Sequence, residues 1–271
     1  MKPPVKLPMK PLFVYAVGIA APGLQGWAQA RPVLAGAQPW LAAPETPYAP
    51  QLLPPNERRR APQGVRQAFR AAEDAQSASS LDFSQLAAVF ASSDSDLTVM
   101  DRINRALAEP VRAVSPTDFH NSVHNAASGY WSIAVGCRQP STAVGGHDGS
   151  FAMGLVEAAA LVHGDGLDVL LVAFDVPPPP LLAACRPLAC AGSIALVLGA
   201  APGAGALARL HLSLADAAES AFPDADLEAL RKGNPALRGL PLLQAIAHGR
   251  AVRVVLPYVS ACSAVIEVEP A

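Results

Sequence analysis

The feature that most constrains the fold is a helix-length run of apolar and small residues near the middle of the 271-residue chain. Residues 149–162 read GSFAMGLVEAAALV, so a helix here is apolar around almost its whole circumference. Such a helix must be buried, and we therefore predict that it lies at the centre of the fold. Asp148 is predicted to cap its first turn, because a carboxylate accepts from the free amides there. Gly164 is predicted to end it.

Two shorter segments precede this helix. Residues 140–146 end in two glycines and predict a short strand, and residues 125–136 contain the small-residue run Ala126-Ala127-Ser128-Gly129, which permits close backbone packing. A strand, a tight glycine turn and a buried helix are how several enzymes present a nucleophile. The start of a helix suits that role, because it lowers the pKa of a thiol placed there.

Strand and helix patterns alternate over the rest of the chain. Alternation of this kind predicts an α/β fold with a largely parallel sheet. Asn56 is predicted to cap a helix that continues through Ala72, and residues 37–55 and the proline run 177–180 are predicted to be irregular connections. The other predicted helices are 98–108, 227–232 and 241–247, and the predicted strands are 86–91, 169–174, 193–198, 210–214, 252–257 and 264–268.

The N-terminus supports two interpretations. Three lysines precede an apolar run at residues 12–21, and Ala28-Gln29-Ala30 follows it, which is the order of a secretory signal. However, Pro22-Gly23 interrupts the run, and the possible cleavage site lies far along the chain. The run is also rich in β-forming residues, as a buried strand is. We favour the buried strand.

The composition argues against several classes of partner. The chain is 51% hydrophobic and 15% charged, with a net charge of −2, so it has no electrostatic basis for binding nucleic acid or an anionic membrane. Its one basic run, Glu57-Arg58-Arg59-Arg60, is more typical of a solvated helix start or an interface. No apolar run is long enough to predict a transmembrane span.

Candidate metal and cofactor sites are weak. The four cysteines form no CxxC pair, which favours reduced, buried thiols over zinc binding. His120 and His124 have the spacing of two ligands on one helix face, but no third ligand is evident, so a structural or interface role is favoured. Residues 203–208 fit GxGxxA, yet a strand pattern follows where a dinucleotide fold needs a helix. We predict neither a metal nor a cofactor.

His147, Asp148 and Ser150 include the three residue types of a hydrolase triad. They are almost adjacent, whereas a triad takes its members from separate elements that face each other. The Gly-x-Ser-x-Gly pattern is also not met. A stand-alone acyl hydrolase or transferase that uses Ser150 or Asp148 is therefore an alternative hypothesis. A secreted protein that binds apolar ligands is another, which the signal-like N-terminus would suit.

Residues 139–162 resemble the nucleophile region of the β-ketoacyl synthases, the condensing enzymes of the thiolase superfamily. In that family a Gly-Pro-Ser stretch leads into a strand and then to a cysteine at the start of a buried helix. Gln139-Pro140-Ser141 corresponds to the lead-in, and counting without a gap places Asp148 at the cysteine position. The apolar segment and Pro-Gly turn at residues 12–23 are similar to the first ketosynthase strand.

The resemblance covers residues 12–200, the first half of a ketosynthase. It implies a thiolase-like layered α/β fold, with helices around a mixed, mainly parallel sheet. Residues 1–200 are expected to form this ketosynthase-like core, and residues 201–271 to complete the same domain with strands and short helices. The family's two histidine motifs, HGTGT and NSFGFGG, belong to the second half and are absent, and His248-Gly249-Arg250 is only a weak remnant.

Three patterns are similar to the chain-length-factor-like proteins of aryl polyene and xanthomonadin-type pigment pathways: FHNSVHN at 119–125, GYWSI at 129–133 and DxSFA at 148–152. The resemblance implies a non-catalytic partner, because condensation needs a thiolate to hold the acyl chain and donors to stabilise the enolate. It also implies a cytoplasmic heterodimer with a catalytic ketosynthase, which an acyl carrier protein reaches through the complex. The residues expected to line the partner interface or acyl tunnel are Phe119, His120, Val123, His124, Asn125, Ser128, Tyr130 and Trp131.

Overall fold

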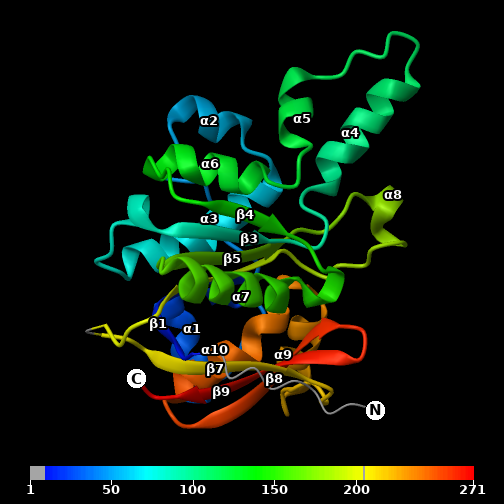
Figure 1. The fold of residues 1–271 in the computed structure, drawn as a ribbon. Coiled ribbons are helices and arrows are strands. Elements are labelled where there is room, and N and C mark those ends of the chain that lie inside the picture. Colours follow the sequence, from blue (N-terminus) through cyan, green and yellow to red (C-terminus); the bar gives the residue numbers. More distant parts are fainter. Residues whose placement is uncertain (1–9, 204) are drawn as a thin grey trace.

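The computed structural model of the chain describes residues 10–203 and 205–271 (Figure 1). Its centre is a nine-stranded sheet with the strand order β4-β3-β5-β6-β1-β7-β9-β8, and β2 pairs with β1. The strands are β1 Leu12–Ala21, β2 Leu24–Gln25, β3 Ala87–Ala91, β4 Ser141–Val144, β5 Val169–Asp175, β6 Gly192–Gly199, β7 Ala208–Ala215, β8 Val252–Val259 and β9 Cys262–Glu269. The helices are α1 Trp27–Leu34, α2 Pro55–Arg60, α3 Gln63–Ser77, α4 Leu97–Ala108, α5 Pro116–Asn121, α6 Ala126–Val135, α7 Ser150–Ala160, α8 Pro180–Ala183, α9 Ala225–Lys232 and α10 Leu240–His248.

The sheet is mixed, as predicted. Strand β3 pairs in parallel with β4 and with β5, because the crossovers between them carry helices α4 to α6 and helix α7. The other pairings among the described residues are antiparallel. The expectation of a mainly parallel sheet therefore holds only for β4-β3-β5. In the remainder, β8 and β9 follow each other through a tight turn and so run antiparallel, whereas β1 pairs antiparallel with β6 and β7, which come much later in the chain.

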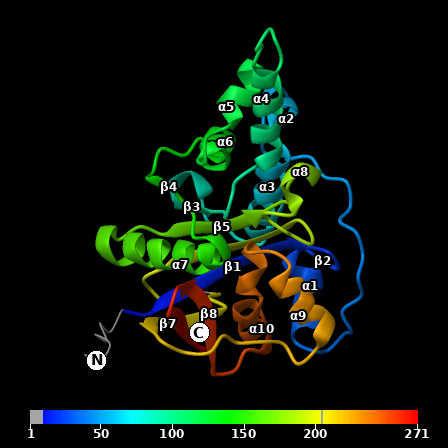
Figure 2. The same cartoon turned by 90° about the vertical axis from the view of Figure 1, so that its right-hand side faces the viewer.

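Helices cover both faces of the sheet (Figures 1 and 2). On one face α3 packs on β1, β5 and β6, and α6 packs on α3 and β3. On the other face α7 packs on β3 and β5, while α10 packs on β8, β9 and α1. Neighbouring residues of β3 alternate between the two cores: Val89 belongs to the α7 side, and Ala88 and Phe90 belong to the α3 side. This alternation produces the layered architecture.

The apolar run near the N-terminus forms β1, whose residues are almost all buried between β6 and β7. The prediction of a buried strand at this position is therefore confirmed. Lys2 and Lys6, which suggested a secretory signal, lie outside the described residues. Among the residues that are described, no helix has both the length and the apolar character needed to cross a membrane.

The helix predicted from Asn56 to Ala72 is divided in two. Helix α2 begins at Pro55 after Pro54, so Asn56 is not its cap; the Asn56 side chain accepts from Arg59 instead. The break falls at Ala61, which precedes Pro62 and takes an extended conformation with ψ near 120°. A residue before proline is disfavoured in the helical region, so α3 starts again at Gln63. The other predicted strands and helices are present, with bounds shifted by a few residues.

Candidate functional site

The turn between β4 and α7 has the predicted strand, glycine turn and helix. Strand β4 ends at Val144, two glycines follow, and a single 3-10 turn at His147–Gly149 leads into α7. His147 has a φ of 51°, in the left-handed region that non-glycine residues rarely adopt. Such strain persists where the surroundings fix the backbone, and it is concentrated at functional sites.

Asp148 does not cap the helix, so this prediction is wrong. The 3-10 turn moves the helix start to Ser150, and the cap position falls on Gly149, which makes no side-chain hydrogen bond. The helix also runs beyond Gly164, through a π-turn at Leu161–Asp165 that ends at Gly166 with a φ of 68°. Its sheet-facing side is buried as predicted, but Ala160 is exposed, because the sheet covers only one side.

Two arginines hold the Asp148 carboxylate. Arg186 Nη1 donates to Oδ1 at 3.1 Å, and Arg238 Nη2 donates to Oδ2 at 3.2 Å. Both arginine side chains are largely buried, at 12% and 13% exposure, whereas the Asp148 side chain is 43% exposed. Each carboxylate oxygen therefore has its own charged donor.

The ion pairs continue away from Asp148 in both directions. Arg186 Nε donates to Asp94 at 2.7 Å, and on the other side Arg238 approaches Glu219 at 3.7 Å. Burial alone would lower the pKa of Arg186, but its hydrogen bonds to the two aspartates outweigh this, and the pKa is raised. We call these five residues, Asp94, Asp148, Arg186, Glu219 and Arg238, the Asp148 network.

Further ion pairs anchor the far end of the network. Glu219 also pairs with Arg231, whose side chain is only 2% exposed and which makes a second pair with Glu228 at 2.8 Å. The hydrogen bond from Arg231 is the main reason that the pKa of Glu228 falls to about 2. Asp148 is therefore part of a fixed electrostatic structure.

Replacing Asp148 with alanine should destabilise the fold through Arg186 and Arg238, which would lose a shared charged acceptor. We expect the free energy of unfolding to fall by about 1–2 kcal/mol, because charge-assisted hydrogen bonds are lost at a partly exposed group. Urea titration would measure the change. Asp216→Ala is the matched control, since Asp216 lines the neighbouring cavity and makes no ion pair within the described chain. Equal stability of D148A and D216A would contradict the anchoring role.

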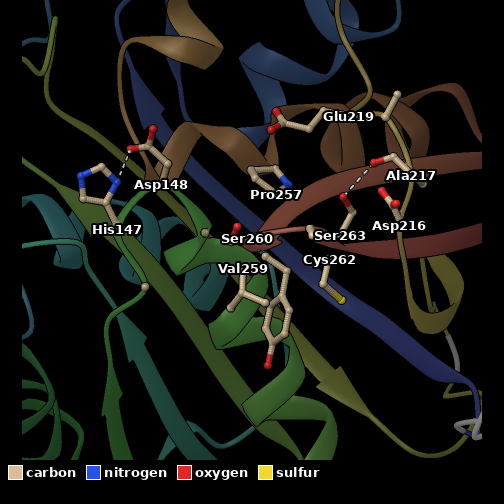
Figure 3. Close-up of a pocket in the computed structure, with 15 residues that line it drawn as sticks. His147, Asp148, Asp216, Ala217, Glu219, Pro257, Val259, Ser260, Cys262 and Ser263 are labelled. Atoms are coloured by element: carbon tan, nitrogen blue, oxygen red, sulfur yellow. Dashed lines mark hydrogen bonds and ion pairs between the residues drawn. The ribbon is translucent and has the colours of Figure 1, made fainter. Parts of the chain in front are cut away.

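A cavity of about 540 Å³ adjoins the turn (Figure 3). The His147–Asp148 turn lies on one side, residues 216–219 on another, and the end of β8 with its turn to β9 completes the lining. The turn packs closely here, because a Cβ atom added to Gly149 would lie 2.0 Å from the Tyr258 carbonyl oxygen. Ser263 Oγ donates to the Ala217 carbonyl at 2.8 Å.

The hydrolase triad is not formed. Ser150 is completely buried, and its Oγ donates to the His147 carbonyl at 2.7 Å and accepts from the Gly146 amide at 3.0 Å. The imidazole of His147 instead lies against Arg186, with 2.9 Å between Nε2 and Nη1. The serine hydroxyl therefore stabilises the turn and has no imidazole to accept its proton.

The other candidate sites are structural in character. His124 Nε2 contacts the Ser92 carbonyl at 3.2 Å, and the ring of His120 lies edge-on to Tyr130, so the two imidazoles have different environments. No group of three or more metal-ligating side chains is found within the described ranges. The GxGxxA segment leads into β7 and not into a helix.

The residues predicted to line an interface separate into two sets. Phe119 and Val123 are 71% and 48% exposed, and the histidines and asparagine of the set are also exposed. Ser128, Tyr130 and Trp131 are at most 5% exposed. The reason is the orientation of α6, which turns this side towards α3 and β3 and leaves Gly129 and Ile133 outside.

No sequence pattern indicated the arginines that hold Asp148. Arg186 and Arg238 are 38 and 90 residues away along the chain, in segments without a recognisable motif. Asp94 lies in the polar loop after β3, where the carboxyl ends of neighbouring strands meet. That loop was the one available signal, because side chains at this edge of a sheet often form sites.

Comparison with known proteins supports a single family. The sequence model of the β-ketoacyl synthase N-terminal domain matches residues 27–253. No curated protein sequence matches the chain.

Solved structures share the fold. The chain is similar to one from the ketosynthase ApeO in complex with its chain length factor ApeC from Xenorhabdus doucetiae, with a TM-score of 0.72, 23% identity and coverage of 97% of this chain and 100% of that one. The ishigamide ketosynthase/chain length factor has a TM-score of 0.72 and 13% identity, with coverage of 96% of this chain and 99% of that one. AntDE:AntF, a type II acyl carrier protein in complex with its ketosynthase, has a TM-score of 0.76 and 13% identity, with coverage of 97% of this chain and 100% of that one.

Proposed function

The chain belongs to the β-ketoacyl synthase family, and we propose that it is a non-catalytic, chain-length-factor-like subunit. Its partner would be a catalytic ketosynthase that makes an aryl polyene or related pigment in a type II system. In this proposal the two subunits form a cytoplasmic heterodimer that an acyl carrier protein supplies. The complexes named for the similar structures support this assignment.

The observation that carries the proposal is the Asp148 network. In the sequence resemblance, Asp148 corresponds to the family's nucleophilic cysteine. A carboxylate that is neutralised by two arginines is a poor nucleophile for a thioester, and each of its oxygens already accepts a guanidinium hydrogen bond. A covalent intermediate needs an activated nucleophile, and ion pairs with two arginines lower the nucleophilicity of this carboxylate. The geometry instead favours a fixed, structural turn.

The proposed partner surface includes the exposed residues of α5, of α6 and of the turn between them, and the edge of β4. Phe119, Val123 and Ile133 are 71%, 48% and 55% exposed, and these apolar side chains would be covered in a complex. Strand β4 is the end strand of the sheet and pairs only with β3 among the described residues. An unpaired edge can add a strand from another chain. Permanent complexes bury on the order of 2,000 Å² or more.

The proposal also includes the domain organisation of the chain, which we take to be a single domain. Strands β7, β8 and β9 extend the sheet beyond β1, and α9 and α10 follow β7. We assign residues 201–271 to the same domain as the ketosynthase-like core on this basis. A limited proteolysis experiment that released a stable fragment ending near residue 200 would contradict this assignment.

The purified chain should not condense acyl groups by itself. We expect no carbon–carbon bond formation when it is supplied with acyl- and malonyl-loaded carrier protein, and Asp148→Cys should also be inactive, because no histidine motif completes the site. Mass spectrometry of the carrier-bound products would detect condensation and, in the same run, thioester hydrolysis. Condensation above the carrier-only background would refute the proposal, and hydrolysis alone would favour the acyl hydrolase alternative.

A further inference from the structure

A second cavity, of about 630 Å³, lies among α2, the start of α3, α4 and α5. Helices α2, α4 and α5 lie together at the top of Figures 1 and 2. The side chains that line it include a single acid, Asp118, and the four arginines Arg59, Arg60, Arg66 and Arg102. The arginines come from three helices. The run Glu57–Arg60 thus gains two further cations that are distant in sequence.

Hydrogen bonds within the chain hold these guanidinium groups in place but engage only some of their N–H donors. Arg66 Nε donates to the Ala61 carbonyl at 2.9 Å, and Arg59 Nη2 donates to Asn56 at 2.6 Å. Arg102 donates from Nε and Nη2 to the same oxygen of Asp118, at 3.0 and 2.6 Å. Each guanidinium carries five N–H donors, so several donors of each arginine are available for a ligand.

The charge of the cavity is not balanced from within. Asp118 is engaged by Arg102, and Arg60 has only a loose pair with Glu57 at 3.6 Å and remains 60% exposed. The cavity also lies at the start of the 15-residue helix α3, where the Gly64 amide donates to the Asp96 carboxylate at 2.9 Å. Because a carboxylate already occupies this helix end, the arginines supply the positive field of the cavity.

We propose that this cavity, the arginine pocket, binds the phosphate group of an organic phosphate. Guanidinium forks from several directions match the oxygens of a phosphate better than a single carboxylate. The cavity is within the range of roughly 300–1,000 Å³ that is typical of small-ligand sites. The source is either a free organic phosphate such as coenzyme A or the phosphate of the prosthetic arm on a carrier protein. Only the second source rests on the proposed function.

Isothermal titration of the full chain tests the proposal without a ketosynthase, so its result is separate from that of the pairing experiments. The probes are inorganic pyrophosphate, coenzyme A, prosthetic-arm-loaded carrier protein and a polyglutamate peptide of matched charge. The double variant R59Q/R66Q should weaken coenzyme A binding at least tenfold. Arg31→Gln is the matched control, because Arg31 is an exposed arginine on α1 at the opposite end of the molecule, and it should change affinity less than twofold.

Binding of coenzyme A or loaded carrier protein that depends on Arg59 and Arg66 supports the proposal, and the stronger of the two probes identifies the source. R66K provides a second check, because it keeps the charge but loses the fork, and it should bind more weakly than the wild type. Tighter binding of polyglutamate than of every phosphate probe would overturn the proposal in favour of an acidic protein segment. Absence of phosphate binding by the wild type, or binding unaffected by a folded R59Q/R66Q, would also overturn it.

Discussion

Phe119→Asp is expected to release the chain from the proposed ketosynthase partner with an increase in Kd of at least a hundredfold. The wild-type side chain is 71% exposed in the isolated chain, so burying it in a complex would contribute about 1.5–3 kcal/mol. An aspartate at the same position would add the cost of burying an unpaired charge. Together these terms exceed the roughly 2.8 kcal/mol that a hundredfold change requires. Affinity between the purified subunits would be measured by native mass spectrometry or titration.

The control for this experiment is Leu41→Asp. Leu41 is 72% exposed and lies in the irregular segment between α1 and α2, where its carbonyl oxygen lies close to Gly23. The same charge placed there should leave the complex intact and the fold unchanged. If F119D and L41D bind the ketosynthase equally well, α5 does not contribute to the partner surface.

Trp131→Ala is expected to reduce the free energy of unfolding by about 3–5 kcal/mol, the range for removing a large aromatic side chain from a core. Trp131 is 1% exposed and packs edge-on against Phe69 and Phe83, with ring centroids 5.3 and 6.0 Å away. Its contribution is therefore to the subunit's own stability, by joining α6 to α3 and to the segment before β3. Urea denaturation followed by circular dichroism would give the value.

Phe119→Ala is the matched comparison, because it removes an exposed aromatic side chain from the neighbouring helix α5. It should change stability by no more than about 0.5 kcal/mol. A W131A protein that is as stable as F119A, but that no longer binds the ketosynthase, would show that Trp131 acts at the interface after all.

The elements were predictable from sequence because apolar runs and punctuating residues determine them locally. Strand β1, the glycine turn after β4 and the helix that follows were all present near their predicted positions. The direction in which a side chain points was harder to predict from the sequence. Tyr130 and Trp131 were expected at an interface, but which side of α6 is buried depends on the packing of α3, which sequence spacing does not specify.

The role of Asp148 shows a second limit. An aspartate before an apolar helix is ordinarily a cap, yet the extra 3-10 turn displaced it, and arginines from two remote segments engaged it. Contacts between residues that are 38 and 90 positions apart follow from the whole topology. The balance of parallel and antiparallel pairing was missed for the same reason, because strand order is not contained in the pattern of any one segment.

The central claim is that this chain sets product length without performing chemistry. The most direct measurement is the length distribution of carrier-bound products made by the catalytic ketosynthase with the wild-type chain, with F119D and with no added chain. We expect one defined length with the wild-type chain, and shorter, mixed or no products with F119D or without the chain. An identical distribution in all three reactions would contradict the claim.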